Sequence, residues 1–287
     1  MLLVHSPAEL REKLSEFRRS AAKIGLVPTM GALHEGHLSL VRKSLESCAV
    51  TVVSIFVNPT QFSPNEDFSR YPRTLEADAA LLAGVEMEGM GEIIVFFPSA
   101  EAMYPPGFCT YVEIGGSAEP LEGERRPGHF RGVATVVLKL FHMTQPDVAF
   151  FGQKDFQQVA VIRQMARELN VPTEIVSCPI IREKDGLAMS SRNRYLSPDA
   201  RRRAVTLYES LCLAESMIRA GKRDVGEIRE KMLEILTPHP EHAVDYVAFV
   251  EPLTLSPVTE ITGSVAILLA VRIGETRLID NILIDSF

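Results

Sequence analysis

Two histidines three residues apart are the strongest chemical signal in this chain. His34 and His37 lie in the string PTMGALHEGH, which follows a short apolar segment. Residues at i and i+3 share one face in the first turn of a helix, and helix amino ends after strands commonly bind phosphate. On the residues alone we weigh a nucleotide-phosphate site, a turn with two surface histidines, and a zinc site. HEGH lacks the H-E-x-x-H spacing and an evident third ligand, so zinc is the weakest alternative.

A second segment offers neutral amides. Asn58 and Gln61 lie in the string NPTQF, directly after the apolar run 50–57. Amide groups can hydrogen-bond a neutral or anionic small ligand without adding charge. The plainer alternative is an Asn-Pro turn, which is common in proteins.

A third segment places a cation after another apolar run. In the string FFGQKDFQQ, Gly152 provides a turn, Lys154 a positive charge and Asp155 a carboxylate. Asp155 either caps the following helix or accepts hydrogen bonds from ribose hydroxyls.

A fourth segment contains two hydroxyls beside a guanidinium. Ser190, Ser191 and Arg192 belong to the string KDGLAMSSRN, and such a set suits an anion such as pyrophosphate. The alternative is a polar linker. Linkers seldom carry Leu-Ala-Met in the middle, which favours a functional loop.

The elements that must position these residues alternate between strand and helix patterns. Apolar, β-branched runs predict strands at 23–28, 50–57, 92–97, 148–151 and 173–180. Apolar residues at helical spacing predict helices at 38–47, 74–83 with Thr74 as cap, 130–143 and 155–169. This alternation predicts an α/β fold with a Rossmann-like, doubly wound parallel sheet, whose ligands bind beyond the carboxyl ends of the strands.

The last third of the chain has a different pattern. Ser197 and the proline after it predict a helix start, with the helix running to about Ala220 and ending at Gly221. A second helix is expected near 225–236, followed by strands at 245–250, 264–271 and 278–284. We therefore predict a nucleotide-binding domain over 1–180 and a smaller α+β domain over 181–287.

Composition excludes several classes of function. The net charge of −7 opposes nucleic acid as a main partner, because phosphate contacts need clustered Lys and Arg. The cysteines show no C-x-x-C spacing. No apolar run approaches the ~20 residues of a membrane helix, and the N-terminus does not resemble a signal peptide. We expect a reduced, cytoplasmic protein.

The motifs together resemble a known family. HEGH resembles the HIGH signature of class I aminoacyl-tRNA synthetases and nucleotidylyltransferases, and MSSR resembles a degenerate KMSKS loop. The strings PTMGALHEGHLSLV, SIFVNPTQF, GQKDFQQ and DGLAMSSRNRYL are jointly similar to the pantothenate synthetases. That resemblance implies ATP-dependent joining of pantoate to β-alanine through a pantoyl-adenylate, with Mg²⁺ on ATP. It also implies a cytoplasmic homodimer whose smaller domain acts as a lid.

The resemblance also implies roles for individual residues. It assigns catalysis to His34, His37, Lys154 and Arg192, with His37 as proton donor. The residues implied to bind ATP are Pro28, Thr29, Met30, His34, Gly36, His37, Gly152, Lys154, Asp155, Ile181, Met189, Ser190, Ser191 and Arg192. It assigns pantoate binding to Gln61 and Gln158, with Asn58 in support.

One stretch departs from the family pattern, and three rival functions were weighed. Residues 86–91 look like a few added residues between a helix and a strand, which could alter the nearby surface or a dimer contact. The rivals are another nucleotidylyltransferase, a synthetase-like RNA-binding protein, and an inactive relative. Gln61 and Gln158 oppose the first, the acidic balance opposes the second, and the intact set of His34, His37, Lys154 and Arg192 opposes the third.

Overall fold

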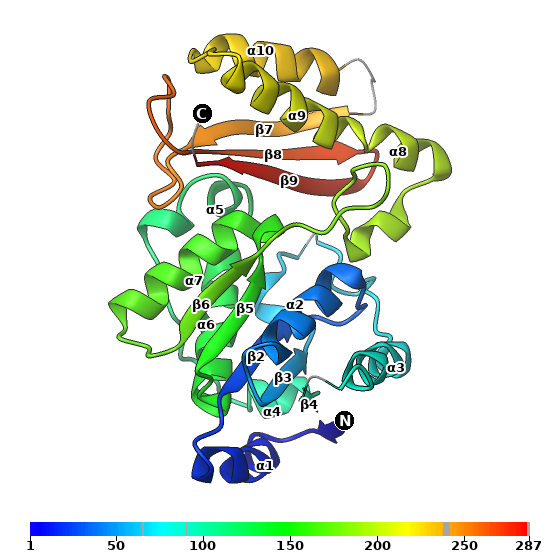
Figure 1. The fold of residues 1–287 in the computed structure, drawn as a ribbon, viewed down its shortest axis with the longest axis vertical. Helices are drawn as coiled ribbons and strands as arrows, with labels where there is room; N and C mark the ends of the chain where they lie inside the picture. The colour runs from blue at the N-terminus through cyan, green and yellow to red at the C-terminus, as the bar shows by residue number, and fades with distance from the viewer. Residues whose placement is uncertain (65, 90, 238–241, 286–287) are drawn as a thin grey trace. The chain divides into compact units, whose positions relative to one another are not determined.

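The chain forms two compact units in the computed structural model. The structure describes residues 1–64, 66–89, 91–237 and 242–285. Unit 1 comprises Met1–Gly152 and Gln157–Cys178, and unit 2 comprises Gln153–Phe156 and Pro179–Phe287. The short segment Gln153–Phe156 therefore groups with unit 2, although it follows a strand of unit 1 (Figure 1).

Unit 1 is built on a six-stranded parallel sheet in the order β1-β4-β3-β2-β5-β6. Its strands are β1 (Leu2–Val4), β2 (Ile24–Thr29), β3 (Val50–Ile55), β4 (Glu92–Phe96), β5 (Val148–Gly152) and β6 (Glu174–Cys178). The five predicted strands are confirmed to within a few residues. β1 was not predicted, because three residues are too few to show a periodic pattern.

Helices cover both faces of this sheet (Figure 1). They are α1 (Pro7–Arg19), α2 (Glu35–Leu45), α3 (Leu75–Glu86), α4 (Ala100–Met103), α5 (Glu122–Arg125), α6 (His129–Thr144) and α7 (Phe156–Glu168). Successive strand residues point to opposite faces. Leu26 and Val52 accordingly pack in one core with α1, α6 and α7, whereas Val27 and Val53 pack in the other with α2 and α3. The doubly wound α/β prediction is confirmed.

The strand order reverses between β2 and β5. From β2 the chain proceeds outward through β3 and β4, and it later returns to place β5 on the other side of β2. Ligands of open parallel sheets bind beyond the carboxyl ends of the strands at such a switch point. The segments that follow β2 and β5 are the ones that contain HEGH and GQKD.

Unit 2 is an antiparallel sheet packed against helices. Its elements are α8 (Pro198–Arg203), α9 (Thr206–Arg219), α10 (Val225–Leu236), β7 (His242–Val250), β8 (Val265–Ile273) and β9 (Thr276–Ile284). The sheet order is β7-β8-β9, and its apolar residues share one core with the helices. The expected α+β composition is confirmed.

The predicted helix from Ser197 to Ala220 is wrong in its continuity. The chain forms α8 and α9, separated by Ala204 and Val205. At the break, the Thr206 hydroxyl donates to the carbonyl of Arg203 at 2.8 Å, and such local side-chain bonds compete with the helical backbone pattern. The start was predicted correctly, because Ser197 caps α8 by accepting from the backbone N–H of Ala200.

Two other local expectations need correction. Thr74 precedes α3 but does not cap it, because its hydroxyl donates to the carboxylate of Asp78 at 3.2 Å instead. α1 was missed, although Ser6 caps it and Pro7 stands at its first position. The Ser-Pro signal that predicted α8 was thus present at this helix as well.

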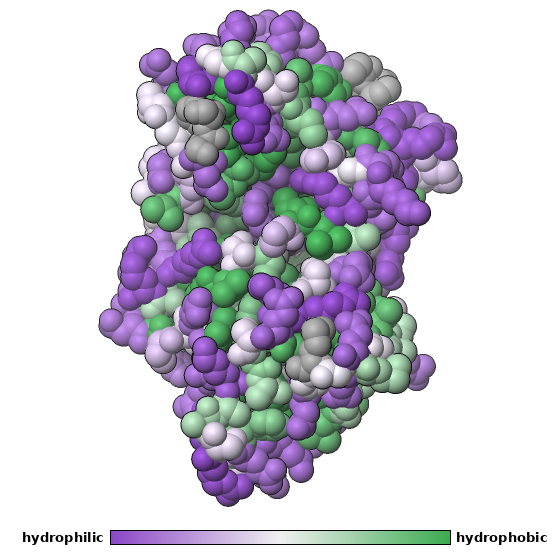
Figure 2. Space-filling model, viewed as in Figure 1, coloured by the Kyte–Doolittle hydropathy of each residue, from purple (hydrophilic) through white to green (hydrophobic). Residues whose placement is uncertain are grey.

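The surface gives no sign of a membrane-spanning helix. Among the described residues, no helix combines the length and apolar character that a bilayer crossing requires. The face drawn in Figure 2 is mostly hydrophilic, with hydrophobic residues in smaller patches.

Candidate functional site

The paired histidines stand at the amino end of α2, just after β2. His34 is the N-cap residue, and its Nδ1 accepts from the backbone N–H of Gly36 at 3.2 Å. The Nδ1 of His37 accepts from the backbone N–H of His34 at 3.4 Å, and the ring centroids lie 4.1 Å apart. A neutral ring that accepts at Nδ1 carries its proton at Nε2. The two half-buried imidazoles can therefore act as a pair of Nε2–H donors.

A buried aspartate holds the loop that leads to these histidines. Asp78 in α3 is 1% exposed and accepts the backbone N–H groups of Ala32 at 2.9 Å and Leu33 at 2.8 Å. The turn is tight, with Gly31 at φ +82° and Ala32 at φ +52°. Sequence reasoning missed Asp78, because its partners are 45 and 46 residues away. Nothing local distinguishes it from other helical aspartates.

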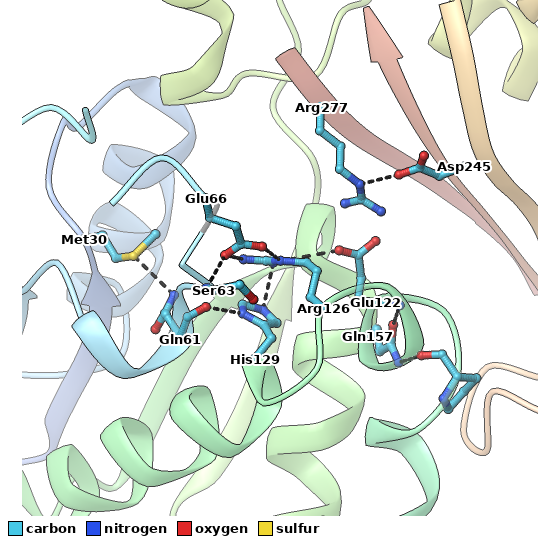
Figure 3. A network of polar contacts seen from close by, with 11 residues as sticks. Met30, Gln61, Ser63, Glu66, Glu122, Arg126, His129, Gln157, Asp245 and Arg277 are labelled. Atoms are coloured by element: carbon cyan, nitrogen blue, oxygen red, sulfur yellow. Dashed lines mark hydrogen bonds and ion pairs between the residues drawn. The ribbon is translucent and has the colours of Figure 1, made fainter. Parts of the chain in front are cut away.

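Asn58 organises the amide segment after β3. It caps the 3₁₀ turn Pro59–Gln61, and its Oδ1 accepts from the hydroxyl of Tyr104 at 2.7 Å. Its Nδ2 donates to the Oε1 of Gln61 at 3.0 Å. The Nε2 of Gln61 then points to the sulfur of Met30 at 3.2 Å, which links the β3 segment to the β2 segment (Figure 3). The structure thus brings Asn58, Gln61 and Met30 together.

A charged network supports the backbone of Gln61 (Figure 3). The Nδ1 of His129 bonds the carbonyl oxygen of Gln61 at 2.9 Å, and its Nε2 lies 3.1 Å from Nη1 of Arg126. A carbonyl and a guanidinium can play only one role each, so Nδ1 donates and Nε2 accepts. Burial, together with the charge of Arg126, lowers the pKa of His129 to about 4, so the ring is neutral.

The same arginine pairs with a loop carboxylate. Arg126 makes two hydrogen bonds to Glu66, at 2.6 and 3.0 Å. Burial raises the pKa of Glu66, but the hydrogen bonds and charge of Arg126 outweigh it and hold the pKa below its usual value. Sequence reasoning missed Glu66, Arg126 and His129. The run RPGHF contained the signal of a histidine at a glycine-preceded helix start, but its partners are far away in sequence.

The two glutamines after β5 differ in their surroundings. Gln157 is buried, and its Nε2 donates to the carbonyls of Ser117 at 2.9 Å and Pro120 at 2.6 Å (Figure 3). Gln158 is half-buried, and its amide makes no hydrogen bond within the described residues. Of the pair, Gln158 is therefore the one whose amide can bind a ligand, as the resemblance implies.

Lys154 and Asp155 lie in a 3₁₀ turn, Gln153–Asp155, between β5 and α7. Lys154 is half-buried, and within the described part of the chain its ammonium makes no ion pair. Asp155 is exposed, and its carboxylate makes no capping bond with any described residue, so the helix-cap alternative is wrong. Gly152 ends β5 opposite Cys178 of β6.

The MSSR segment lies in unit 2 after a narrow hairpin. Met189 donates its backbone N–H to the carbonyl of Ile181 at 2.9 Å, so these two predicted ATP contacts are neighbours. Ser190 caps the 3₁₀ turn Ser191–Tyr195 by accepting from the backbone N–H of Arg192 at 3.2 Å. The hydroxyl of Ser190 and the backbone of Arg192 are thereby fixed together.

The residues that looked like an insertion are tied to the rest of unit 1. Glu86 accepts from the backbone N–H of Ile93 at 3.0 Å and pairs with the amino group of Met1. Glu88 accepts from Arg42 of α2 at 3.0 Å. Residue 90 lies outside the described residues. The idea that 86–91 are added residues stays a prediction.

These features define a Rossmann-like α/β enzyme whose histidine-capped helix starts at the switch point of a parallel sheet. Comparison with known proteins specifies it further. The family model described as pantoate-beta-alanine ligase matches residues 2–283. A pantothenate synthetase of Moorella thermoacetica is 51% identical over 285 residues, covering 99% of each chain. The chain therefore belongs to the pantoate-beta-alanine ligase family.

Solved structures agree with this assignment. A pantoate-beta-alanine ligase from Thermus thermophilus is 46% identical, with a TM-score of 0.92 over 98% of this chain and 99% of its own. A pantoate-beta-alanine ligase from Francisella tularensis is 35% identical, with a TM-score of 0.76 over 99% of this chain and 97% of its own. The Francisella protein was crystallised with beta-gamma ATP and beta-alanine.

Proposed function

We propose that this enzyme joins pantoate to β-alanine through a pantoyl-adenylate formed from ATP. The observation that carries the proposal is the pair of Nδ1-anchored imidazoles of His34 and His37 at the amino end of α2, in a chain of this family. Helix amino ends and Nε2–H donors are both suited to phosphate oxygens. The amides of Gln61 and Gln158 suit a small acid without a phosphate group.

The proposed reaction has two balanced steps. A carboxylate oxygen of pantoate attacks the α-phosphorus of ATP, and the bond to the bridging oxygen breaks as pyrophosphate leaves. The amine of β-alanine then attacks the acyl carbon, loses a proton and displaces AMP. The first step brings two anions together, which is unfavourable without positive groups. We assign that role to Lys154 and Arg192, with His34 and His37 stabilising charge on the leaving phosphates.

The remaining contacts are proposed from the segments in which they lie. Pro28, Thr29, Met30, Gly36, Gly152, Asp155, Ile181, Met189, Ser190 and Ser191 complete the ATP site. Gln61 and Gln158 bind pantoate, with Asn58 holding Gln61 in place. Neutral amides leave the pantoate carboxylate nucleophilic, because they add no charge that would overstabilise it.

Mg²⁺ is proposed to arrive on the phosphates of ATP. Among the described residues there is no cluster of three or more His, Cys, Asp or Glu that could hold a metal ion alone. This donor set fits an ion that keeps phosphate and water ligands, which is usual for Mg²⁺. Bound there, the ion would neutralise charge on the leaving group.

The broader organisation stays a prediction. We propose that 1–180 binds the nucleotide, that 181–287 acts as a lid, and that the enzyme is a cytoplasmic homodimer.

The proposal is tested by product analysis with the purified protein. ATP, Mg²⁺ and pantoate without β-alanine should release pyrophosphate in a single turnover, and β-alanine should then release AMP and pantothenate. Replacing pantoate with acids that carry a phosphate group tests the rival nucleotidylyltransferase function. Pyrophosphate release that requires β-alanine would overturn the two-step order, and no pantothenate at all would overturn the proposed function.

A further inference from the structure

Two adjacent buried residues on β9 hold two separate predicted ATP segments. Asp280 and Asn281 are each 2% exposed, and neither belongs to a motif discussed above. Buried polar side chains are costly unless their hydrogen bonds are made, so the partners of this pair indicate why it is there. All of those partners lie in unit 2.

Asn281 holds the turn that contains Lys154. Its Nδ2 donates to the backbone carbonyl of Gln153 at 3.0 Å and to that of Lys154 at 2.9 Å. Its Oδ1 accepts from the Nε2 of Gln153 at 3.4 Å. Both amide hydrogens are therefore spent on consecutive carbonyls of the 3₁₀ turn, which sets the point from which the Lys154 side chain extends.

Asp280 holds the hairpin that leads to the MSSR segment. Its carboxylate accepts two hydrogen bonds from Arg182, at 2.6 Å from Nη1 and 3.0 Å from Nη2. The same guanidinium donates to the carbonyl of Gly186 at 3.1 Å and lies 3.9 Å from the ring centroid of Tyr208. Arg182 is thus fixed by a carboxylate, a carbonyl and an aromatic face.

The hairpin itself transmits this fixation to the loop. Arg182 and Ala188 form an antiparallel bridge, and Met189 donates its backbone N–H to Ile181. Asn193 donates from Nδ2 to the carbonyl of Ala188 at 3.0 Å, which ties the far end of MSSR to the same hairpin. A change at Asp280 therefore acts on both ends of the loop.

We propose that Asp280 and Asn281 are positioning residues that set the Lys154 turn and the MSSR loop from one rigid strand. The inference rests on the proposed function, because it assumes that both segments contact ATP. A strand buried between neighbours is a stiff support, and small misplacements of charged groups reduce phosphoryl-transfer rates steeply. Neither residue is assigned a contact with substrate.

The test uses Asn281→Asp in the full-length protein. This change keeps the side chain's shape but replaces both donors with acceptors facing two carbonyls. We expect single-turnover pyrophosphate release to fall about 10- to 100-fold, the scale for a misplaced catalytic group. Hydrogen exchange measured by mass spectrometry should accelerate in peptides covering 153–156, whereas a general loss of structure would accelerate it throughout unit 2.

A second variant tests Asp280. Asp280→Asn alone leaves a buried guanidinium poorly paired, so the double variant Arg182→Gln with Asp280→Asn is the variant to measure, since it keeps a neutral hydrogen-bonded pair. We expect faster exchange in peptides covering 181–193, with 153–156 less affected, and slower pyrophosphate release. The two variants should thus loosen different segments.

Ile284→Val on the same strand is the matched control. Ile284 is 2% exposed in the unit 2 core, and its truncation lowers stability without removing a polar contact. The control should leave pyrophosphate release within about 2-fold of wild type. Unchanged local exchange in Asn281→Asp and the double variant, or an equal activity loss in Ile284→Val, would overturn the inference. Wild-type protein that makes no pantothenate would instead count against the proposed function, since the exchange experiment needs no activity.

Discussion

The buried imidazole of His129 donates from Nδ1 to the backbone carbonyl of Gln61 over 2.9 Å, although the two residues are 68 positions apart. Arg126 donates to the opposite ring nitrogen, so this bond exists only while the ring is neutral. The position of the proposed pantoate amide therefore depends on an uncharged histidine.

The first prediction concerns pH and His129. Its pKa is about 4 in the folded chain against an ordinary 6.5, so the unfolded chain binds more protons between those values. The free energy of unfolding should therefore fall as pH drops from 6.5 to 4, by about 3 kcal/mol. Urea unfolding across this range should show a smaller pH dependence in His129→Asn than in wild type.

His142→Asn is the control for that experiment, because His142 is exposed on the same helix. An NMR titration of the rings gives a direct check. If His129 titrates near its ordinary pKa, or if both variants lose the same pH dependence, the assigned tautomer and network are wrong.

The second prediction concerns the close approach of α6 to the Gln61 turn. A Cβ at Gly132 would lie 2.3 Å from the carbonyl oxygen of Thr60 and 2.6 Å from the backbone nitrogen of Gln61. Gly132→Ala should displace the turn and raise the KM for pantoate by at least ~10-fold, on the scale of a misplaced binding group. The KM for ATP should change much less.

Gly84→Ala provides the comparison, since a Cβ at Gly84 meets nothing within 4 Å. In the middle of α3 this change should be neutral or stabilise by about 0.5–1 kcal/mol. Equal pantoate KM values for Gly132→Ala and wild type would contradict the role given to the turn.

The third prediction concerns the aspartate that clamps the histidine loop. Asp78→Asn replaces one of the acceptors for the backbone of Ala32 and Leu33 with a donor. We expect a loss of about 1–3 kcal/mol of stability, the cost of an unsatisfied buried donor, together with slower adenylate formation. Thr74→Ala removes only a bond to the same carboxylate and should cost less in thermal unfolding. A milder effect from Asp78→Asn than from Thr74→Ala would refute the clamp.

The fourth prediction separates adjacent glutamines. Gln158→Ala should raise the KM for pantoate while leaving the melting temperature nearly unchanged. Gln157→Ala should lower the melting temperature, because it leaves the Ser117 and Pro120 carbonyls without their donor. Steady-state kinetics and calorimetry on both variants measure this division. If Gln158→Ala moves only the ATP constant, its assignment to pantoate fails.

The fifth prediction concerns Lys154. Lys154→Ala should slow single-turnover pyrophosphate release by at least ~10²-fold, the usual loss when one electrostatic stabiliser is removed. Lys222→Ala, at an exposed lysine that pairs with Glu227, should leave the rate unchanged. Near-normal release by Lys154→Ala would count against the proposed electrostatic mechanism.

Much of the scaffold was predictable because its signals are local. The apolar runs of β2, β3 and β5 are continuous, as buried parallel strands require, and each is followed at once by a polar motif. Capping signals behaved unevenly. Ser197 caps its helix, whereas Thr74 donates to a neighbouring carboxylate and Asp155 lies in a 3₁₀ turn. Cap position depends on which partner the side chain finds.

The amino-acid sequence by itself determined the alternating α/β pattern, the four motifs and the family to which they belong. Tertiary structure alone decided which residues hold those motifs in place. Asp78, His129 and Asn281 act on backbone groups 45, 68 and 127 residues away. Propensity and periodicity report on neighbours along the chain, whereas a buried hydrogen bond depends on which distant groups the fold brings within about 3 Å.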